Sequence, residues 1–481
     1  MRILLVKPKA RLATVRGLER LQRLEPLELG YLAAAVPPTH VVRILDLRLY
    51  RFPDWAYYHA LTGFHPDLIG ITGYSHEAAE VKRLALLAKR HLENAFVVVG
   101  GHHATVAPAD LNVAGIDAIV RGEGCGPFAA LVATLAAGRP PQGIPHLLRT
   151  GAEYDPAACA VWPRYPNPNT LPIPRRDLWD WRNYYCVWVS ERPTAWAPIF
   201  PRTAMVRSSW GCRMPCTFCI VPDLCGGMHM PRAVESVVEE IAALQANYVY
   251  FCDDENFIDE AFAMALAEGL ARRGVRKRYF AWTRATTVNR SPEVMRRWRE
   301  VGLDCAFLGF EFPTDGELRA VKKGGTVAGN QRAHKLLRDL GIAVHAAFML
   351  MPEWCEADFA RLREFVAAMP PAQFSFTVCT PSPGTPDYAG IADRIWAPDR
   401  FDLHDCMHPL IPTTLPLRRF SQLYAGLLTA AGERHPLRLM RHPIRPWDAA
   451  RLVWAESRWR RSFANLYRDY PGELWGQGPL P

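Results

Sequence analysis

The sequence lacks any long apolar run and any segment laid out like a cleaved signal peptide. No window approaches the about 18 consecutive apolar residues that a membrane-spanning helix needs. The opening MRILLVKPKA has an apolar run of only four residues. Internal repeats and low-complexity segments are missing as well. We therefore expect a cytoplasmic protein without a spanning helix.

Charged residues make up only 22% of the 481 positions, whereas apolar residues make up 49%. This balance is typical of a well-packed globular protein and excludes a disordered one. The length predicts two or three domains. Lysine and arginine outnumber aspartate and glutamate by 57 to 48, which gives a net charge of +9. Such a bias is compatible with an anionic cofactor, a nucleic acid or a membrane surface.

Residues 1–145 predict a doubly wound α/β domain with a parallel sheet. An amphipathic pattern at 77–92 predicts a helix between two of its strands. Three strands end in glycine-rich turns, where the ligand of an open parallel sheet can approach the backbone closely. The runs that indicate buried strands are 2–8, 41–47, 67–73, 96–101 and 117–124, and the turns contain Gly70, Gly73, Gly100, Gly101, Gly122, Gly124 and Gly126.

Residues 201–390 predict a second β/α series. Six strands are too few for a closed eight-stranded barrel, so we expect a partial, laterally open (β/α)6 barrel. Residues 146–200 are rich in proline and aromatic side chains and predict an ordered connector. Residues 391–481 predict a mainly helical C-terminal region. The six strands are expected at 203–209, 248–254, 278–285, 304–311, 343–351 and 374–380.

Three cysteines gather in the stretch SSWGCRMPCTFCIVP, as Cys212, Cys216 and Cys219. In a reducing compartment the twelve cysteines of the chain are not expected to form a disulfide framework, so this cluster predicts a metal site. A structural zinc ion needs a fourth donor, and Cys225 and His229 are near enough in sequence to supply it. With three ligands, a four-iron cluster instead keeps one iron open for a substrate.

The C-x3-C-x2-C motif, with the aromatic Phe218 before its third cysteine, resembles that of the radical S-adenosylmethionine (SAM) enzymes over residues 201–390. The resemblance implies a [4Fe–4S] cluster on the three cysteines and SAM bound at the open iron. Asp253, Asp254 and Glu255 end the second strand, where acidic residues of such enzymes take the SAM amino group. A helix N-cap is the alternative role for the two aspartates.

Two further positions follow from the same resemblance. Arg284 ends the third strand and is implied to pair with the SAM carboxylate, a bidentate task that suits a guanidinium group. A structural ion pair is its alternative role. Glu311, in LGFE, is implied to hold the ribose hydroxyls, with a salt bridge at the barrel mouth as the alternative. The stretch TPSPGTPDY at 380–388 resembles the turn after the sixth strand in enzymes that carry a cobalamin domain.

The N-terminal domain resembles the cobalamin-binding domain of many radical SAM enzymes, in the motifs EPLELGYLAAA, GITGYSHEA, GGHHAT and RGEGCGPF. No D-x-H-x-x-G occurs, so the resemblance implies cobalamin without the lower axial histidine of that motif. For His76, a surface or capping role, corrin contact and ligation of cobalt remain open. The positions implied to contact cobalamin are Thr72, Gly73, Tyr74, Ser75, His76, Gly100, Gly101, His102, His103, Gly122, Glu123 and Gly124.

The two resemblances together imply a class B radical SAM C-methyltransferase that methylates an unactivated carbon. In that family one SAM supplies the methyl group through cobalamin and a second yields a 5′-deoxyadenosyl radical, with electrons from a donor such as flavodoxin or ferredoxin. The arrangement of motifs is similar to the hopanoid C-3 methylases, which implies a small-molecule or lipid substrate. Alternatives are methylases of other natural products, the anaerobic oxidative cyclase of tetrapyrrole synthesis, and a non-catalytic cobalamin- or metal-sensing module.

The C-terminal region has a basic, tryptophan-bearing pattern at 446–470. Such a helix could rest on the inner face of a membrane, or it could close the open side of the barrel. We do not expect nucleic-acid binding, because no recognised motif accompanies the basic stretch. The side chains expected near one helical face are Trp447, Ala450, Trp454, Phe463, Tyr467 and Tyr470, with Arg451, Arg458, Arg460, Arg461 and Arg468 largely elsewhere.

Overall fold

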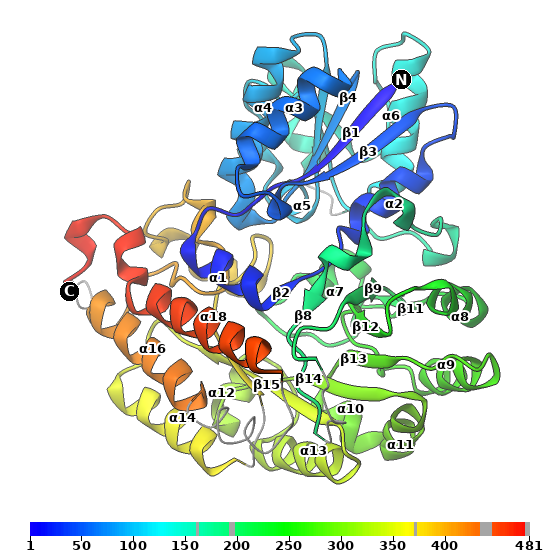
Figure 1. Ribbon diagram of the computed structural model, residues 1–481. Coiled ribbons are helices and arrows are strands. Elements are labelled where there is room, and N and C mark those ends of the chain that lie inside the picture. Colours follow the sequence, from blue (N-terminus) through cyan, green and yellow to red (C-terminus); the bar gives the residue numbers. More distant parts are fainter. Residues whose placement is uncertain (160–162, 192–197, 370–372, 433–444, 477–481) are drawn as a thin grey trace.

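Two parallel sheets and a helical C-terminal region make up the computed structural model, which describes residues 1–159, 163–191, 198–369, 373–432 and 445–476. The N-terminal domain lies over one end of a half-open barrel, and the C-terminal helices run along the barrel's side (Figure 1). Among the helices of these residue ranges, none is both long and apolar enough to cross a membrane.

The first sheet has the strand order β3-β1-β4-β5-β6-β7. The strand order reverses between β1 and β4, and ligands of such sheets lie outside the carboxyl ends of the strands at this reversal. All neighbouring strands are parallel except β6 and β7. The strands are β1 (Arg2–Lys7), β3 (Val41–Asp46), β4 (Leu68–Thr72), β5 (Phe96–Gly100), β6 (Ala118–Val120) and β7 (Leu147–Arg149).

Helices cover both faces of this sheet, which confirms the predicted doubly wound domain. Helices α3 (Pro53–Phe64) and α4 (Ala78–His91) pack on one face, and α2 (Leu27–Ala35) and α6 (Cys125–Ala136) pack on the other. Strand β7 lies in the segment expected to be connector. It is a half-buried edge strand with one buried residue among three, so no continuous apolar run marks it in the sequence.

The second sheet is the predicted six-stranded open barrel, with the order β16-β15-β14-β13-β12-β9 and parallel pairing throughout. Most strands end a few residues before the predicted limits, because the polar residues that follow them enter loops. The strands are β9 (Thr203–Val206), β12 (Tyr248–Phe251), β13 (Arg278–Thr283), β14 (Leu303–Glu311), β15 (Ala343–Leu350) and β16 (Gln373–Val378).

Helices wrap the outer face of the barrel and bury the largest apolar core of the chain. Two of them begin at side-chain caps: Asp259 accepts from the N–H of Phe262 at the start of α9, and Thr326 accepts from that of Gly329 at the start of α13. The helices are α8 (Val234–Ala243), α9 (Glu260–Arg272), α10 (Ala285–Arg290), α11 (Pro292–Val301), α12 (Asp315–Ala320), α13 (Val327–Asp339) and α14 (Glu356–Ala368).

The connector closes the amino end of the barrel. Trp188 packs against Tyr248 at the start of β12, with ring centroids 5.0 Å apart. Its indole N–H donates to Asp304 at 2.8 Å, and the same carboxylate oxygen accepts from the Ser190 hydroxyl. Arg278, at the start of β13, pairs with Asp304 at 2.9 Å. Access to the barrel interior is therefore from the carboxyl end, which faces the N-terminal domain.

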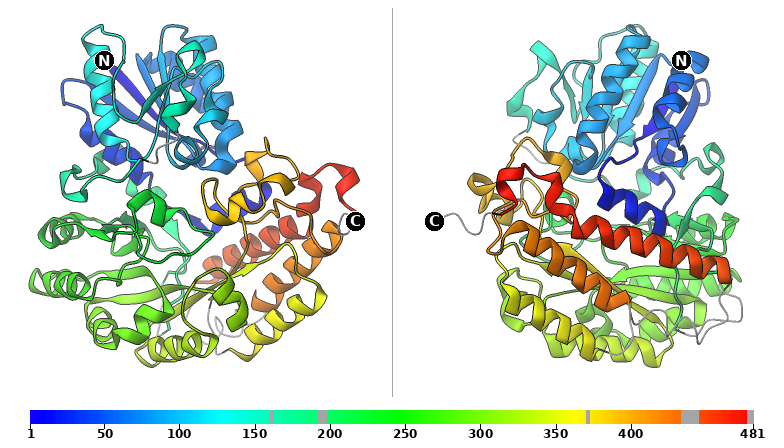
Figure 2. Two further views of the ribbon diagram at one scale, coloured as in Figure 1. Left: turned by 180° about the vertical axis from the view of Figure 1, so that it is seen from behind. Right: turned by 60° about the vertical axis from the view of Figure 1, so that its left-hand side comes forward.

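The C-terminal helices form two layers on the barrel. Helix α16 (Leu417–Gly432) covers β16, where the Tyr424 hydroxyl donates to the carbonyl of Phe376 at 2.6 Å. Helix α18 (Pro446–Ala464) packs outside α16 and against α1 (Ala13–Leu21), as Figure 2 shows from the side. Helix α16 rather than α18 thus covers the last barrel strand.

The single helical face expected at 446–470 is wrong. Phe463 is fully buried, whereas Trp447 and Trp454 are more than half exposed. Phe463 follows Trp454 by nine positions, which corresponds to about two and a half turns at 3.6 residues per turn, so the two side chains point to opposite sides. The helix also ends at Ala464, and the buried Tyr470 follows in an irregular segment.

Candidate active site

A cavity of about 480 Å³ lies between the carboxyl ends of the two sheets. Its walls come from both domains, including Lys7 and Tyr31 on one side and Arg207 and Trp210 on the other. Of the positions implied to contact cobalamin, nine line this cavity: Thr72, Gly73, Tyr74, Gly100, Gly101, His102, Gly122, Glu123 and Gly124.

Two glycines in the floor of the cavity adopt backbone conformations that side chains disfavour. Gly101 has φ of +96°, and an added Cβ would lie 2.7 Å from Oγ1 of Thr72. Gly122 has φ of +71°, and an added Cβ would meet the ring of Pro163. The Thr105 hydroxyl joins these turns, because it donates to the carbonyl of Gly101 and accepts from the N–H of Gly122, both at 2.9 Å. These two turns therefore present backbone without side chains to the cavity, and Thr105 holds them together.

Tyr74 is the most exposed aromatic side chain of the N-terminal wall, at 53%. Its ring is parallel to that of His76 at 5.7 Å, and the Lys7 ammonium lies 4.8 Å from its centre. The His102 ring also lies near Tyr74, with ring centroids 6.0 Å apart. Burial, together with His103 and His76, lowers the pKa of His102 to about 4, so this imidazole is neutral near pH 7.

Three of the implied cobalamin contacts lie outside the cavity lining: Ser75, His76 and His103. His103 is buried, and both of its ring nitrogens have partners. Nδ1 lies 3.3 Å from the Ser75 hydroxyl, and Nε2 lies 2.9 Å from the Asp110 carboxylate. Burial is the main cause of the lowered pKa of His76, while the nearby Glu77 and Asp405 raise it. In this arrangement Ser75 and His103 stabilise the loop, and His76 supports the ring of Tyr74.

The conformation of the cysteine loop is fixed by contacts with Asp254 and Cys225. Gly211 has φ of +89°, and a Cβ there would lie 2.2 Å from the carbonyl oxygen of Met228 and 2.8 Å from Cβ of Cys225. Its N–H donates to Asp254 at 2.8 Å, and Asp254 also pairs with Arg207 at 2.9 Å. The buried Cys225 thiol faces the carbonyl of Cys212 at 3.7 Å. Cys225 therefore supports the loop.

Cys216 is buried, and Cys212 and Cys219 are half-buried. Burial raises the pKa of Cys219 to about 12, so a thiolate at this position needs a positive partner such as iron. No set of three or more Cys, His, Asp or Glu side chains within the described ranges converges on one metal ion. A four-iron cluster does not require such convergence, since each of its thiolates binds a different iron.

The three acidic residues after β12 differ in how far their oxygens are satisfied. Asp253 accepts from the backbone N–H groups of Ser208 and Ser209 at 2.7 and 2.8 Å, and from the Ser208 hydroxyl and Asn256. Glu255 accepts from the Thr283 hydroxyl through Oε1, at 2.7 Å, but its buried Oε2 has no hydrogen-bond partner. Burial raises the pKa of Glu255 to about 7. An ammonium group such as that of SAM would satisfy this oxygen.

Arg284 and Glu311 lie on either side of Lys323 at the barrel mouth. Arg284 is buried, donates to the Cys216 sulfur at 3.5 Å and to the carbonyl of Lys323, and keeps Nε without a partner. Glu311 pairs with the Lys323 ammonium at 2.5 Å, the alternative expected for it. Its φ of +62° follows a bulge between Gly309 and Glu311. Such strain and bulges are common beside active sites.

The turn after β16 joins the two halves of the site. Asp387 accepts from the Thr217 hydroxyl at 2.9 Å, within the cysteine loop. Five residues earlier, the Ser382 hydroxyl lies 3.4 Å from Nε2 of His102. Phe218, beside Thr217, is half-buried against the barrel core. The segment that resembles a cobalamin-associated turn therefore contacts both the cysteine loop and the cavity floor.

Sequence patterns did not single out Tyr31 and Arg207. The hydroxyl of Tyr31 is buried in the cavity wall without a hydrogen-bond partner, and it would be satisfied by a ligand with amide groups. Arg207 lies 4.7 Å over the ring of Trp210. Its position five residues before the first cysteine of the motif is a signal that could have identified it; Tyr31 carries no such signal.

The inner wall of the barrel is aromatic. Residues on the inward positions of β12, β13 and β14 form a cluster separate from the outer core and continuous with the cavity through Met205 and Cys252. The rings of Trp282 and Phe307 are 3.9 Å apart, and those of Tyr250 and Phe280 are 4.9 Å apart. This wall offers a large apolar surface beneath the cysteine loop.

Residues 13–132 match the B12 binding domain, and residues 206–366 match the radical SAM superfamily. The chain is 28% identical over 403 residues to the hopanoid C-3 methylase of Methylococcus capsulatus, which covers 83% of this chain and 74% of that protein. It is 29% identical over 400 residues to an uncharacterized methyltransferase of Pyrococcus horikoshii, which covers 80% and 82%.

The fold is also that of a solved structure, the radical SAM methyltransferase TsrM of Kitasatospora setae with cobalamin and a [4Fe–4S] cluster bound. The TM-score is 0.62 at 22% identity, over 82% of this chain and 78% of that one. A B12-binding domain and a radical SAM domain on one chain mean that its cofactors are cobalamin, a [4Fe–4S] cluster and SAM. The chain therefore combines a B12-binding domain with a radical SAM domain, and it is similar in sequence to methyltransferases along most of its length.

Proposed function

We propose that the enzyme methylates an unactivated carbon of a hopanoid, at C-3. The observation that carries this proposal is the 28% identity to a hopanoid C-3 methylase along 83% of the chain. The aromatic inner wall of the barrel supports it, because an almost wholly apolar ring system needs a large apolar surface for binding.

In this proposal Cys212, Cys216 and Cys219 hold the cluster, with Phe218 packed behind the loop. The unpartnered oxygen of Glu255 takes the SAM ammonium. Asp253, whose oxygens are already used by Ser208, Ser209 and Asn256, holds the loop instead. Asp254 also acts on the loop, through the N–H of Gly211.

Arg284 and Glu311 complete the proposed SAM site. The guanidinium of Arg284 lies beside the Cys216 sulfur and can reach a carboxylate bound next to the cluster. Glu311 is held at the barrel mouth by Lys323, where its second oxygen can accept from ribose hydroxyls. Both roles place SAM between the cysteine loop and the carboxyl ends of the strands.

The glycine turns and the cavity between the domains are the proposed cobalamin site. Bound cobalamin supplies a methyl group, and the cluster with SAM supplies a carbon-centred radical. The flat turns at Gly101 and Gly122 admit a large cofactor, and Tyr74 and His102 face it from the N-terminal domain. We propose no ligand to cobalt from His76, which lies behind Tyr74.

The barrel itself protects the radical step. Trp188 and Ser190 cover the amino end, and the cavity at the carboxyl end lies beside the N-terminal domain. No side chain has to act as a general base when the methylated carbon is saturated. Reduction of the cluster and of cobalamin calls for an electron donor such as flavodoxin or ferredoxin, on the cytoplasmic side of the membrane that contains the hopanoid.

Anaerobic reconstitution with iron, sulfide and cobalamin, followed by assay with a detergent-solubilised hopanoid, tests the proposal. Each product should gain one methylene in mass and should appear with one S-adenosylhomocysteine and one 5′-deoxyadenosine. The Cys216→Ala variant, treated in the same way, is the control for cluster-dependent turnover. Deoxyadenosine without S-adenosylhomocysteine would favour an oxidative cyclase, and methylation of a tetrapyrrole but not of the hopanoid would replace the substrate.

A further inference from the structure

Helix α18 carries an exposed stripe that runs along its whole length. The exposed positions recur every three or four residues, which places them on one side of the helix. The opposite side is buried, with Leu452, Ala455 and Phe463 fully covered. The stripe is apolar toward the N-terminus and basic toward the C-terminus, and it consists of Trp447, Ala450, Val453, Trp454, Ser457, Arg458 and Arg461.

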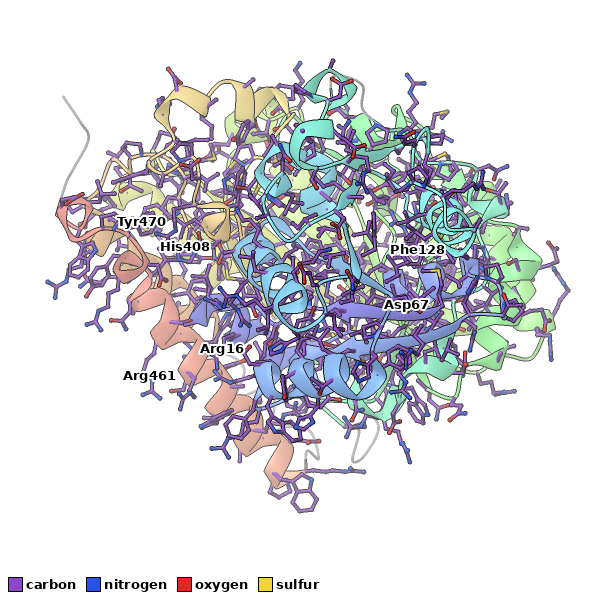
Figure 3. All side chains as sticks on the ribbon, turned by 90° about the horizontal axis from the view of Figure 1, so that it is seen from above. Arg16, Asp67, Phe128, His408, Arg461 and Tyr470 are labelled. Atoms are coloured by element: carbon purple, nitrogen blue, oxygen red, sulfur yellow. The ribbon has the colours of Figure 1, made fainter. Side chains whose placement is uncertain are left out.

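Helix α1 of the N-terminal domain widens this stripe into a surface. The two helices approach closely because Gly17 has no side chain: an added Cβ would lie 2.3 Å from the indole of Trp459. That indole donates to the carbonyl of Thr14 at 3.1 Å. As a result Arg16 and Arg20 of α1 lie beside α18, and Figure 3 shows Arg16 and Arg461 on the same side of the molecule.

The charge on this surface is concentrated and of one sign. The Arg20 guanidinium lies 5.2 Å from the ring of Trp454, and that of Arg458 lies 5.5 Å from the same ring. Among the described residues, no carboxylate forms an ion pair with any of the four arginines Arg16, Arg20, Arg458 and Arg461. Burial and the neighbouring Arg458 and Arg16 lower the pKa of Arg20, as expected where like charges gather.

We propose that this surface docks the enzyme on an anionic lipid bilayer. Exposed tryptophans are the side chains that settle at the level of lipid headgroups, and unpaired arginines meet anionic headgroups. Trp447 and Trp454 are 69% and 52% exposed, and folding alone does not require them there. The docking surface comprises Arg16, Arg20, Trp447, Val453, Trp454, Arg458 and Arg461.

The two helices come from opposite ends of the chain, so the bilayer would contact the N-terminal and C-terminal regions together. Docking does not depend on the identity of the substrate. Its consequence for catalysis does rest on the proposed function: an enzyme held at the bilayer can collect an apolar substrate that scarcely dissolves in water.

The test uses the full chain and sedimentation with vesicles of phosphatidylcholine alone or with about a third phosphatidylglycerol. The wild type should bind the anionic vesicles, and salt should weaken binding because it screens exposed charges. With about 1 kcal/mol per basic residue, replacing Arg16, Arg20, Arg458 and Arg461 by glutamine should lower the partition coefficient by two to three orders of magnitude. Trp447→Ser with Trp454→Ser should weaken binding independently of salt.

The matched control replaces four exposed arginines on the outside of the barrel by glutamine, which changes the net charge equally: Arg272, Arg276, Arg319 and Arg332. This variant should bind vesicles like the wild type. All variants should cleave SAM normally with a chemical reductant, which shows that they are folded. Equal binding to neutral vesicles, or equal loss in the control, would refute the proposal. So would normal vesicle binding by the docking variant together with slower turnover driven by flavodoxin, since the surface would then dock an acidic protein.

Failure of docking and failure of the proposed function are separable. Methylation of the detergent-solubilised hopanoid does not need the bilayer, so the docking variant should retain it while losing activity on vesicle-embedded substrate. If the enzyme binds vesicles but does not methylate a hopanoid, the docking proposal stands and only the proposed substrate is wrong.

Discussion

Replacement of Glu255 by glutamine should stabilise the SAM-free protein and weaken SAM binding at the same time. Glu255 is 2% exposed, and its Oε2 has no hydrogen-bond partner. Burial, partly offset by the Thr283 hydroxyl and the N–H of Arg284, raises its pKa from 4.5 to about 7. Between these values the folded state binds a proton that the unfolded state has lost, so stability falls as pH rises, by about 3 kcal/mol in total.

The Glu255→Gln variant lacks this pH-dependent loss. Its amide oxygen can still accept from Thr283, so the remaining contacts are kept. Relative to the wild type, it should gain about 1 kcal/mol at pH 5.5 and about 3 kcal/mol at pH 8.5. For a domain of about 190 residues, the increase of about 2 kcal/mol corresponds to about 5 °C in Tm. Anaerobic calorimetry of the SAM-free protein across this pH range measures it.

Isothermal titration with SAM provides the second measurement. Loss of a buried carboxylate that faces an ammonium group should weaken SAM binding at least tenfold, because charged hydrogen bonds contribute about 1.5–3 kcal/mol. Asp253→Asn is the matched control for SAM binding, since the Asp253 carboxylate is already saturated by Ser208, Ser209 and Asn256. A pH-independent difference for Glu255→Gln, or lower stability at pH 8.5, would show that Oε2 is already satisfied and would refute the reasoning.

Three further outcomes are expected. Gly211→Ala should lose bound iron, because its Cβ would collide with the Met228 carbonyl and distort the cysteine loop; iron and sulfide analysis against the wild type checks this, and full iron content would contradict it. Cys225→Ser should instead retain iron and SAM cleavage, and loss of both would make Cys225 a ligand. Burial alone would lower the pKa of His408, but the carboxylates of Asp405 and Asp469 raise it to about 9. His408→Gln should therefore lose about 3 kcal/mol below pH 6.5, and the deficit should shrink as pH rises through 9, which urea unfolding at several pH values can follow.

The strands were predictable because buried parallel strands are continuous apolar runs. All eleven predicted strands are present, whereas β7, with one buried residue among three, has no such run. The open barrel followed from counting strands. The packing of α18 did not, because the expected face combined Trp454 with Phe463 on the opposite side of the helix, and with Tyr467 and Tyr470 beyond its end at Ala464.

The positions of the site residues were predictable only to the level of the loop. Parallel strands bring their carboxyl ends to one edge, so the glycine turns and the acidic residues after β12 were expected there. Which of Asp253 and Glu255 keeps a free oxygen depends on contacts with Ser208 and Thr283, which are distant in sequence. The same holds for Ser75 and His103, whose partners draw them away from the cavity.

A buried ionic network joins the N-terminal domain to the barrel, in addition to apolar contacts such as those of Val106 with Ile220 and Leu224. Glu25, before α2, pairs with Arg176 of the connector at 2.6 Å and accepts from the N–H of Met205 in β9 at 2.8 Å. Arg176 pairs in turn with Glu240 of α8 at 2.7 Å, and Glu240 pairs with Arg232 at 2.6 Å.

Buried ion pairs contribute little net stability, but they are directional, and a pair left incomplete costs several kcal/mol. A slip of one domain over the other would leave such charges unpaired. Methyl transfer between cofactors held on different domains needs one fixed geometry, since a displacement of about 1 Å can cost a hundredfold in rate. The network at Glu25 and Arg176 thus fixes the two walls of the cavity relative to each other. The contacts of Ser382 and Asp387 fix the edge of the cavity in the same way.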